Sequence, residues 1–402
     1  MKRIYCLFGF VFFLKQILPA QEVVFRYNFD DCTYEDASIA FPGMTPGGSP
    51  LCVCGIGESS YFVDGSDDFL TVSNQANKLF DADFTLDFYF WMDDQIGETD
   101  IFSHRNGCAS LDSLMALRYF SSTNELLFEI GSNVNNYHSV RSVLSEDICW
   151  HRFTLVKFQL EYLVYFDNKL VKRIISRENI GFSRNSGLTF ANSPCNTVNQ
   201  ANKMKGRIDE VTLYKRALSD LEILNLYQYP DQIKTENTTI FKGESITLES
   251  GPSCASVVTW TPASTLDNAN SESPLATPEE STTYHVSFNN GTCTSTDTVR
   301  IFVADKDKLD CDNLLFPKAF TPNNDGLNDR YGISNIFLIE SIEYFEIYDR
   351  WGAKVWETKE AADQWDGTIK GQPLNSGMYL YKIKYTCGQE EKLNIDNFTL
   401  IR

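Results

Sequence analysis

The sequence is poor in basic residues, and this limits the partners that the protein can have. Its 402 residues include 35 lysines and arginines against 54 aspartates and glutamates, which gives a formal net charge of −19. No basic patch offsets this charge, so nucleic acid is excluded as a partner. The acidic residues are spread along the chain rather than gathered in one tail, which favours an ordinary solvated surface.

Long apolar runs are also scarce. A membrane-spanning helix needs about 20 consecutive apolar residues, and only the N-terminus comes near this length. There, Lys2 and Arg3 precede an apolar stretch over residues 4–18, and Ala20 offers a small-residue cleavage site. This order is typical of a secretory signal peptide, which we place at residues 1–20. We therefore expect an exported mature chain without a transmembrane segment.

Residue patterns that support catalysis are missing as well. None of the four histidines lies in a nucleophile motif such as Gly-x-Ser-x-Gly. Glycoside hydrolases need two carboxylates about 5–9.5 Å apart, and on a strand this requires acidic residues at alternate positions. Asp87 has no such partner, and Asp209 and Glu210 are adjacent and so point to opposite faces. We predict that the protein is not an enzyme.

Cysteine, by contrast, is well represented. Ten of the eleven cysteines remain once the signal peptide is removed: six before residue 230, two before residue 305 and two beyond it. Exported proteins use such even sets as disulfides, and a zinc site would need a second ligand pair at suitable spacing, which is absent. We predict that each segment closes its own bridges, with Cys254–Cys293 and Cys311–Cys387 paired. The connectivity of the six earlier cysteines is left open.

Short strand-like runs dominate residues 22–229. Apolar and polar residues alternate over residues 23–30, and further runs include residues 84–92, 152–158 and 207–214. Turn signals rich in Asp, Asn and Gly separate many of these runs. Many short strands with almost no helix predict an all-β fold, here a β-sandwich.

Four segments of this region resemble, in order, the motifs of laminin-G-like jelly rolls. They read YFVDGSDDFL at residues 61–70, FTLDFYFW at 84–91, CWHRFTLV at 149–156 with LVYFDNKLV at 163–171, and GRIDEVTLYKRALS at 206–219. The resemblance implies a concanavalin-A-like β-sandwich over residues 22–229. It also implies that the ligand is a polysaccharide or a surface protein.

The same resemblance points to one structural calcium ion, because related sandwiches often hold one near the chain ends. Asp30 in the first strand and Asp209 in the last converge if these strands pair, and Asp36 lies in the loop that follows the first strand. Carboxylate oxygens suit Ca²⁺. The alternative is that Asp209 accepts hydrogen bonds from backbone amides of the loop that it faces, and the sequence leaves both possibilities open.

The middle segment, residues 232–304, is rich in Thr, Ser and Val, which favour short strands. Its WTP at residues 260–262, SPLATP at 273–278 and TTYHV at 282–286 resemble the immunoglobulin-like or PKD-like repeats of bacterial surface proteins. The resemblance implies a small immunoglobulin-like β-sandwich that acts as a spacer.

The last segment, residues 311–402, carries five blocks that resemble a family of sorting domains. The blocks are LFPKAFTPNNDGLND at residues 315–329, IYDRWG at 347–352, WDG at 365–367, NSGMYLY at 375–381 and FTLIR at 398–402. Their order is that of the type B C-terminal sorting domain of type IX secretion substrates, also called the gliding-motility-associated C-terminal domain. The resemblance implies a small β-sandwich that the type IX secretion machinery recognises, export across an outer membrane, and retention at the cell surface.

Together the segments predict a secreted protein that is anchored at the outer-membrane surface and binds a glycan or a protein through residues 22–229. One alternative is a structural adhesin without a small-ligand site. Another is a carbohydrate-active enzyme, for which the sequence offers no specific residue pattern. Whether the sorting domain is cleaved after export is left open.

Overall fold

The computed structural model describes residues 22–93, 95–182, 187–198, 201–305, 314–323, 328–339, 341–387 and 390–402. Its regular structure is almost entirely strand, which confirms the predicted all-β class. The predicted signal peptide lies outside the described residues. No helix in the described part of the chain combines the length and the apolar character that a membrane crossing requires. The described residues form two compact units, of which the first continues to Thr238 and includes Ser245–Ile301, and the second combines Thr239–Glu244 with Phe302–Arg402.

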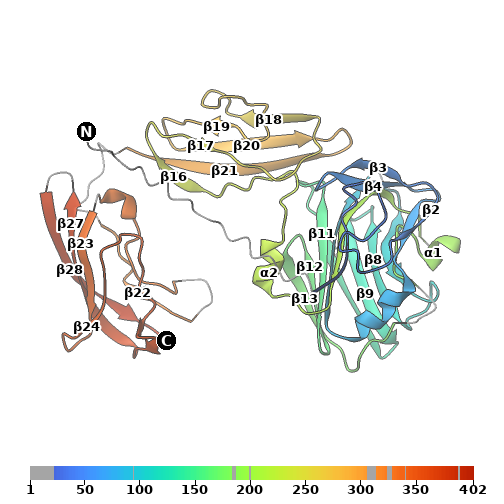
Figure 1. The fold of residues 1–402 in the computed structure, drawn as a ribbon, viewed down its shortest axis with the longest axis horizontal. Coiled ribbons are helices and arrows are strands. Elements are labelled where there is room, and N and C mark those ends of the chain that lie inside the picture. The colour runs from blue at the N-terminus through green and yellow to red at the C-terminus, as the bar shows by residue number, and fades with distance from the viewer. Residues whose placement is uncertain are drawn as a thin grey trace, which may run out of the picture. The chain divides into compact units, whose positions relative to one another are not determined.

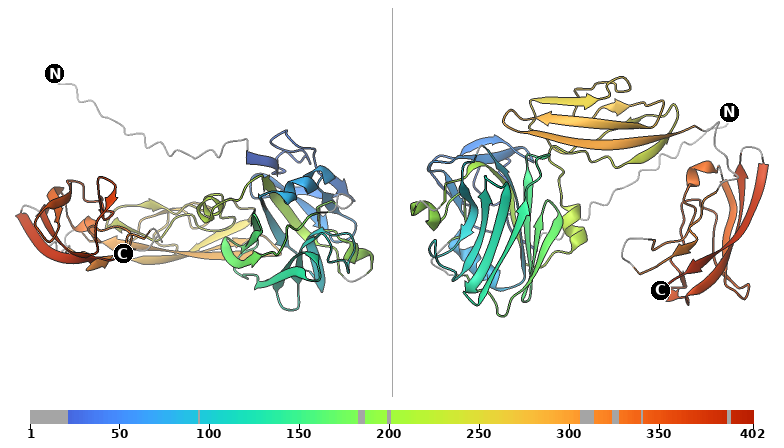
Figure 2. Two further views of the ribbon diagram at one scale, coloured as in Figure 1. Left: turned by 90° about the horizontal axis from the view of Figure 1, so that it is seen from below. Right: turned by 180° about the vertical axis from the view of Figure 1, so that it is seen from behind.

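Two facing sheets form the first sandwich (Figures 1 and 2). The larger sheet has eight strands, in the order β13 (Lys169–Ile175), β12 (Glu161–Phe166), β11 (His151–Phe158), β6 (Phe84–Met92), β15 (Lys205–Tyr214), β4 (Ser59–Asp64) and β3 (Leu51–Cys54), with β1 (Val23–Tyr27) also paired to β15. The smaller sheet has seven, in the order β10 (Asn136–Val143), β9 (Glu125–Asn133), β8 (Leu114–Phe120), β7 (Glu98–His104), β14 (Thr189–Phe190), β5 (Phe69–Thr71) and β2 (Thr45–Gly47). The first and last strands of the sandwich, β1 and β15, pair antiparallel as expected.

Aromatic side chains fill the core between these sheets. Phe88, at the centre of β6, packs its ring against Phe102, Phe153 and Phe190, with centroid separations of 5.5, 5.4 and 5.1 Å. All four side chains are completely buried. Helices are few, as predicted, and those described in this sandwich include the 3-10 helix η2 (Asn74–Asp81), α1 (Pro194–Thr197) and α2 (Asp220–Asn225).

The middle segment also folds into two sheets, which fits the predicted immunoglobulin-like sandwich. One sheet has the order β16 (Thr238–Phe241), β21 (Thr294–Ala304), β20 (Thr282–Asn289) and β18 (Val257–Thr261), and the other pairs β17 (Ile246–Thr247) with β19 (Leu275–Ala276). Trp260 is completely buried, and its indole nitrogen donates a hydrogen bond to the Ser271 carbonyl at 2.9 Å. One face of β18 and β20 therefore supplies the core of this small domain.

The disulfides correct two of our predictions. Cys254 is bonded to Cys54 and Cys293 to Cys149, so the predicted Cys254–Cys293 bridge is wrong, and so is the prediction that each segment closes its own bridges. The two bridges join residues 200 and 144 positions apart in the sequence, across the first sandwich and the middle domain. The reason is tertiary: the β3 end and the loop before β11 lie against the middle domain, where each pair of Cα atoms comes within 5.9 Å, a distance that suits a disulfide.

The remaining bridges bear on the other cysteine predictions. Cys32–Cys52 and Cys108–Cys195 close within the first sandwich, as expected for part of the early set. The predicted Cys311–Cys387 bridge stays a prediction, because Cys311 and the side chain of Cys387 lie outside the described residues. Two disulfides join the middle domain to the first sandwich. In the described structure the middle domain is therefore not a freely hinged spacer. Our domain boundaries themselves stay predictions.

The C-terminal domain is built on one five-stranded sheet and one two-stranded sheet. The larger has the order β22 (Ala319–Phe320), β28 (Glu390–Leu400), β27 (Gly377–Cys387), β23 (Ser341–Tyr348) and β24 (Lys354–Thr358), and the smaller pairs β25 (Thr368–Ile369) with β26 (Gln372–Pro373). A 3-10 helix, η4 (Ile336–Leu338), precedes β23. The core of the C-terminal domain is aromatic. Tyr331 stacks on Phe398 at 3.5 Å between ring centroids, and Trp365 is 1% exposed.

Candidate functional site

The predicted calcium ligands Asp30 and Asp209 face the same loop, between β3 and β4. Asp209 accepts a hydrogen bond from the Ile56 amide at 2.7 Å, and Asp30 accepts one from the Glu58 amide at 2.6 Å. The alternative geometry that we considered for Asp209, a carboxylate bonded to the amides of its facing loop, is therefore present. Both carboxylates fix this loop, whatever else they bind.

One of these acids, Asp209, is deeply buried beside two other carboxylates. Asp209 is completely buried, and burial raises its pKa well above the usual value, although the Ile56 amide works in the opposite direction. The negative charges of Glu210 and Asp30 raise the pKa further. Burial also raises the pKa of Glu210. A cation placed here would relieve both the repulsion and the desolvation, and carboxylates are ligands that Ca²⁺ accepts.

Asp36 stabilises a different loop, the one that follows β1. Its carboxylate accepts hydrogen bonds from the backbone amides of Arg26, Ala40 and Phe41 at 2.7, 2.9 and 2.9 Å. Burial alone would raise the pKa of Asp36, but the hydrogen bonds from Arg26, Ser38 and Ala40 outweigh it and lower the pKa. Asp36 thus pins the loop after β1, and the structure does not gather it with Asp30 and Asp209 into one group of ligands.

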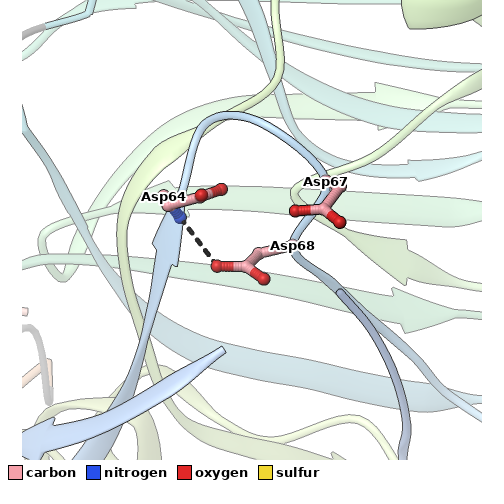
Figure 3. A group of neighbouring side chains, drawn as sticks. All are labelled: Asp64, Asp67 and Asp68. Carbon is pink, nitrogen blue, oxygen red and sulfur yellow. Dashed lines mark hydrogen bonds between the residues drawn. The ribbon is translucent and has the colours of Figure 1, made fainter. Parts of the chain in front are cut away.

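Within the described residues, one trio of carboxylates does come together, at the turn between β4 and β5 (Figure 3). Asp64, Asp67 and Asp68 each offer an oxygen, and these oxygens lie within 4.8 Å of one another. Asp68 accepts hydrogen bonds from the Asp64 amide at 3.1 Å and from the Ser49 amide at 2.6 Å. These hydrogen bonds stabilise the turn, which accounts for the closeness of the three carboxylates. In the sequence, the laminin-G-like motif at residues 61–70 contains all three aspartates.

Asp87 is held by an arginine rather than offered to a substrate. Arg152 donates to both Asp87 oxygens, from Nε at 2.8 Å and from Nη2 at 2.7 Å, and Thr154 donates to one of them at 2.7 Å. The remaining Arg152 nitrogen, Nη1, bonds the Ile223 carbonyl at 2.7 Å. The pair is buried and ties β6, β11 and α2 together, because β6 has no solvated side for its polar residues.

A second group of charged side chains lies on the smaller sheet, and its arginines and carboxylates also neutralise one another. Arg118 contacts Asp100 at 3.2 Å, and Arg105 contacts Glu129 at 3.5 Å. Ser193 donates a hydrogen bond to the other oxygen of Asp100. The carboxylates in these buried groups are therefore bound by arginines, hydroxyls or backbone amides, which differs from the two opposed carboxylates of a glycosidase.

Comparison with protein families assigns two parts of this chain. Residues 64–224 match the model described as the concanavalin A-like lectin/glucanases superfamily. Residues 314–398 match the type IX secretion signal domain. The chain therefore contains a concanavalin A-like domain and a type IX sorting domain, as the sequence motifs predicted. No curated protein matches the chain.

Solved structures give only distant likeness. Domain 4 of AbnA, a GH43 extracellular arabinanase from Geobacillus stearothermophilus solved with arabinotriose, is 14% identical with a TM-score of 0.42, over 52% of this chain and 98% of that one. The binding domain of botulinum neurotoxin DC, in complex with rat synaptotagmin II, is 12% identical with a TM-score of 0.42, over 95% of each chain. The serotype C1 binding domain is 12% identical with a TM-score of 0.43, over 95% of this chain and 94% of that one.

Proposed function

We propose that this chain, which carries a concanavalin A-like domain ahead of a type IX secretion signal domain, is a non-catalytic binding protein displayed at the cell surface. The C-terminal domain directs secretion through the type IX machinery. The first sandwich and the middle domain form the part that is presented outside. Its ligand is a glycan or a surface protein.

One observation carries the non-catalytic assignment: the buried carboxylates of the concanavalin A-like domain are engaged inside the protein. Asp87 is bonded by Arg152, Asp100 by Arg118, and Asp209 by the Ile56 amide. A retaining or inverting glycosidase instead needs two carboxylates that are free to face a sugar. The lectin side of the superfamily therefore fits these residues better than the glucanase side.

A binding experiment tests the proposal. The mature protein would be applied to a glycan array and to intact partner cells, and reducing-sugar release from the bound glycans would be measured in parallel. We expect binding without release. Hydrolysis of any glycan by residues 22–229 would overturn the non-catalytic assignment.

Surface display is tested by deletion of residues 311–402 in the native host. We expect the truncated protein to stay in the periplasm, because the export label is lost while the N-terminal signal remains. Immunolabelling and protease treatment of intact cells would locate it. Undiminished display of the truncated chain would contradict the proposal.

The two bridges between the first sandwich and the middle domain favour a second candidate, a load-bearing structural adhesin. Covalent links resist pulling forces better than a hinge of few contacts does. An adhesin of this kind would give cell-to-cell or cell-to-surface adhesion in the host while every array spot stays blank. The array and an adhesion assay together therefore separate the two candidates.

A further inference from the structure

A groove of about 510 Å³ lies along the solvent face of the middle domain's larger sheet. Its floor comes from β18, β20 and β21, which lie side by side (Figure 1), and Asp147 of the first sandwich lines it as well. Ligand sites commonly have volumes of about 300–1,000 Å³ and occur between domains. Neither the sequence motifs nor the family matches assign any role to this groove.

The floor of the groove is a regular array of five hydroxyl groups and one imidazole. Strand pairing aligns Thr261, His285 and Thr298 in one row across the three strands. It aligns Thr259, Ser287 and Thr296 in a second row, two residues along each strand. Directly paired residues share a face and have Cβ atoms about 4.5–5.5 Å apart. The six side chains therefore form two parallel rows of polar groups on one surface.

The opposite faces of the same strands hold this array in place. Trp260, Val286 and Val299 alternate with the groove residues and are buried in the core of the middle domain. A shift of register by one residue would bring the hydroxyls into that core and expose the tryptophan. The spacing of the hydroxyl rows is thus fixed by the packing beneath them.

The end of the groove at Asp147 is fixed by the first sandwich. The Thr296 amide donates to the Asp147 carbonyl at 2.8 Å, and the Cys149 amide donates to the Ser295 hydroxyl at 2.9 Å. The Cys149–Cys293 disulfide joins the same two segments. The segment that contains Asp147 and strand β21 are therefore held together before a ligand binds. This reduces the entropy lost on binding.

The lining selects the chemical class of ligand. Asp147 adds negative charge, and the described lining contains no lysine or arginine, so anionic ligands are disfavoured. The floor includes β20, which is paired on both sides, and β18, which is the edge strand of the sheet. The Trp260 amide of β18 already donates to the Ala269 carbonyl at 2.8 Å, so this edge is only partly free for a peptide to extend. Hydroxyl groups both donate and accept hydrogen bonds, as the hydroxyls of a neutral sugar do.

We infer that this groove is a binding site for a neutral oligosaccharide, which its two hydroxyl rows recognise. The inference rests on the proposed binding function and names its location in the middle domain rather than in the concanavalin A-like sandwich. The ligand lies across the strands, with sugar hydroxyls bonded to the threonines and to the carboxylate of Asp147.

The test compares variants of the full mature chain by calorimetric titration with the strongest neutral hit of a glycan array. Thr261→Val with Thr298→Val removes two hydroxyls from exposed positions and keeps the branched shape that strands favour. We expect at least about tenfold weaker binding, since each lost hydrogen bond weakens affinity severalfold. Thr399→Val, an exposed strand threonine in the C-terminal domain, is the matched control and should bind as the wild type does.

Asp147→Asn supplies a second measurement, because only its exposed side chain changes and its backbone contact with Thr296 is kept. We expect severalfold weaker binding with an unchanged melting temperature and unchanged disulfides. Wild-type affinity in both groove variants would overturn the groove assignment while leaving the proposed function standing. A wild-type protein that binds no glycan at all would instead contradict the glycan form of the proposed function. Preferential capture of an anionic glycan in the groove would overturn the ligand class.

Discussion

The first sandwich and the C-terminal domain are both β-structures, but they hold their charges differently. In the sandwich, Arg152 and Asp87 are paired inside the protein, where the arginine side chain has no exposed surface. In the C-terminal domain the described ion pairs lie at the surface, as where Lys384 meets Glu343 at 2.5 Å and Glu391 at 2.9 Å. Buried pairs cannot lose one partner without leaving a desolvated charge, whereas surface pairs lose little.

The two regions also differ in the size and make-up of their hydrophobic cores. The sandwich packs one extended cluster between two broad sheets and adds disulfides. The C-terminal domain relies on a small cluster of packed aromatic rings, including Tyr331, Trp365 and Phe398, beside its five-stranded sheet. A small domain buries a smaller share of its surface, so aromatic side chains with a large contact area suit it. The two regions should therefore respond to different perturbations.

The largest expected effect is that of breaking the buried ion pair. Arg152→Met leaves the Asp87 carboxylate buried without its partner, and we expect the sandwich to lose about 3–5 kcal/mol of unfolding free energy. For a domain of this size the melting temperature should fall by roughly 10 °C. Chemical denaturation followed by tryptophan fluorescence would measure it.

A double variant and a surface control sharpen this prediction. Adding Asp87→Leu to Arg152→Met should restore part of the lost stability, because no unpaired charge then remains. Lys354→Met in the C-terminal domain removes a surface partner of Glu346 and should leave the melting curve unchanged. Equal effects of Arg152→Met and Lys354→Met would remove the contrast between the two regions.

Removal of the bridges between domains should have the next largest effect. Cys149→Ser with Cys293→Ser opens one of the two links, and we expect a loss of about 2–4 kcal/mol, confined to the disulfide-joined unit. Peptide mapping of the non-reduced wild type should recover Cys54 linked to Cys254 and Cys149 linked to Cys293. Recovery of a Cys254–Cys293 peptide would contradict the structure and restore our sequence-based pairing.

Calcium should stabilise the first sandwich and not the C-terminal domain. An ion held by Asp30 and Asp209 would add about 2.7 kcal/mol at a hundredfold excess over its Kd, a melting shift of roughly 5–10 °C. Asp209→Ala should abolish the shift. Asp36→Asn should keep it, because the Asp36 carboxylate is occupied by the amides of its own loop. A melting temperature that changes with neither calcium nor a chelator would contradict the calcium proposal.

The smallest expected effect is a loss of stability at acidic pH. Hydrogen bonds from Arg216 lower the pKa of Glu222 from 4.5 to about 2, so its stabilising contribution is complete above pH 4.5 and is lost as the pH falls through about 2. Because the pair is partly exposed, we expect less than about 1 kcal/mol. Glu222→Gln should flatten the stability curve of the sandwich between pH 4.5 and 2. An unchanged slope in this range would show that the Arg216 contact contributes nothing in solution.

The candidate site was only partly within reach of sequence reasoning. The pairing of β1 with β15 was predicted, and it places Asp30 and Asp209 at the same loop. The role of Asp36 was not predicted, because its bonding to its own loop depends on where the chain turns. Trp351, a large aromatic residue close after β23, is 82% exposed, which its sequence position did not indicate.

Local patterns in the sequence determined the strands, the all-β class and the two recognisable domains, because side-chain alternation and turn residues act over a few positions. Only the tertiary structure decided which cysteines meet, since the Cys54–Cys254 pair spans 200 residues and depends on how two domains pack. The same holds for the hydroxyl groove, whose rows exist only once β18, β20 and β21 are aligned in register. A sequence records each threonine separately, and the hydrogen-bonded sheet sets the distances between them.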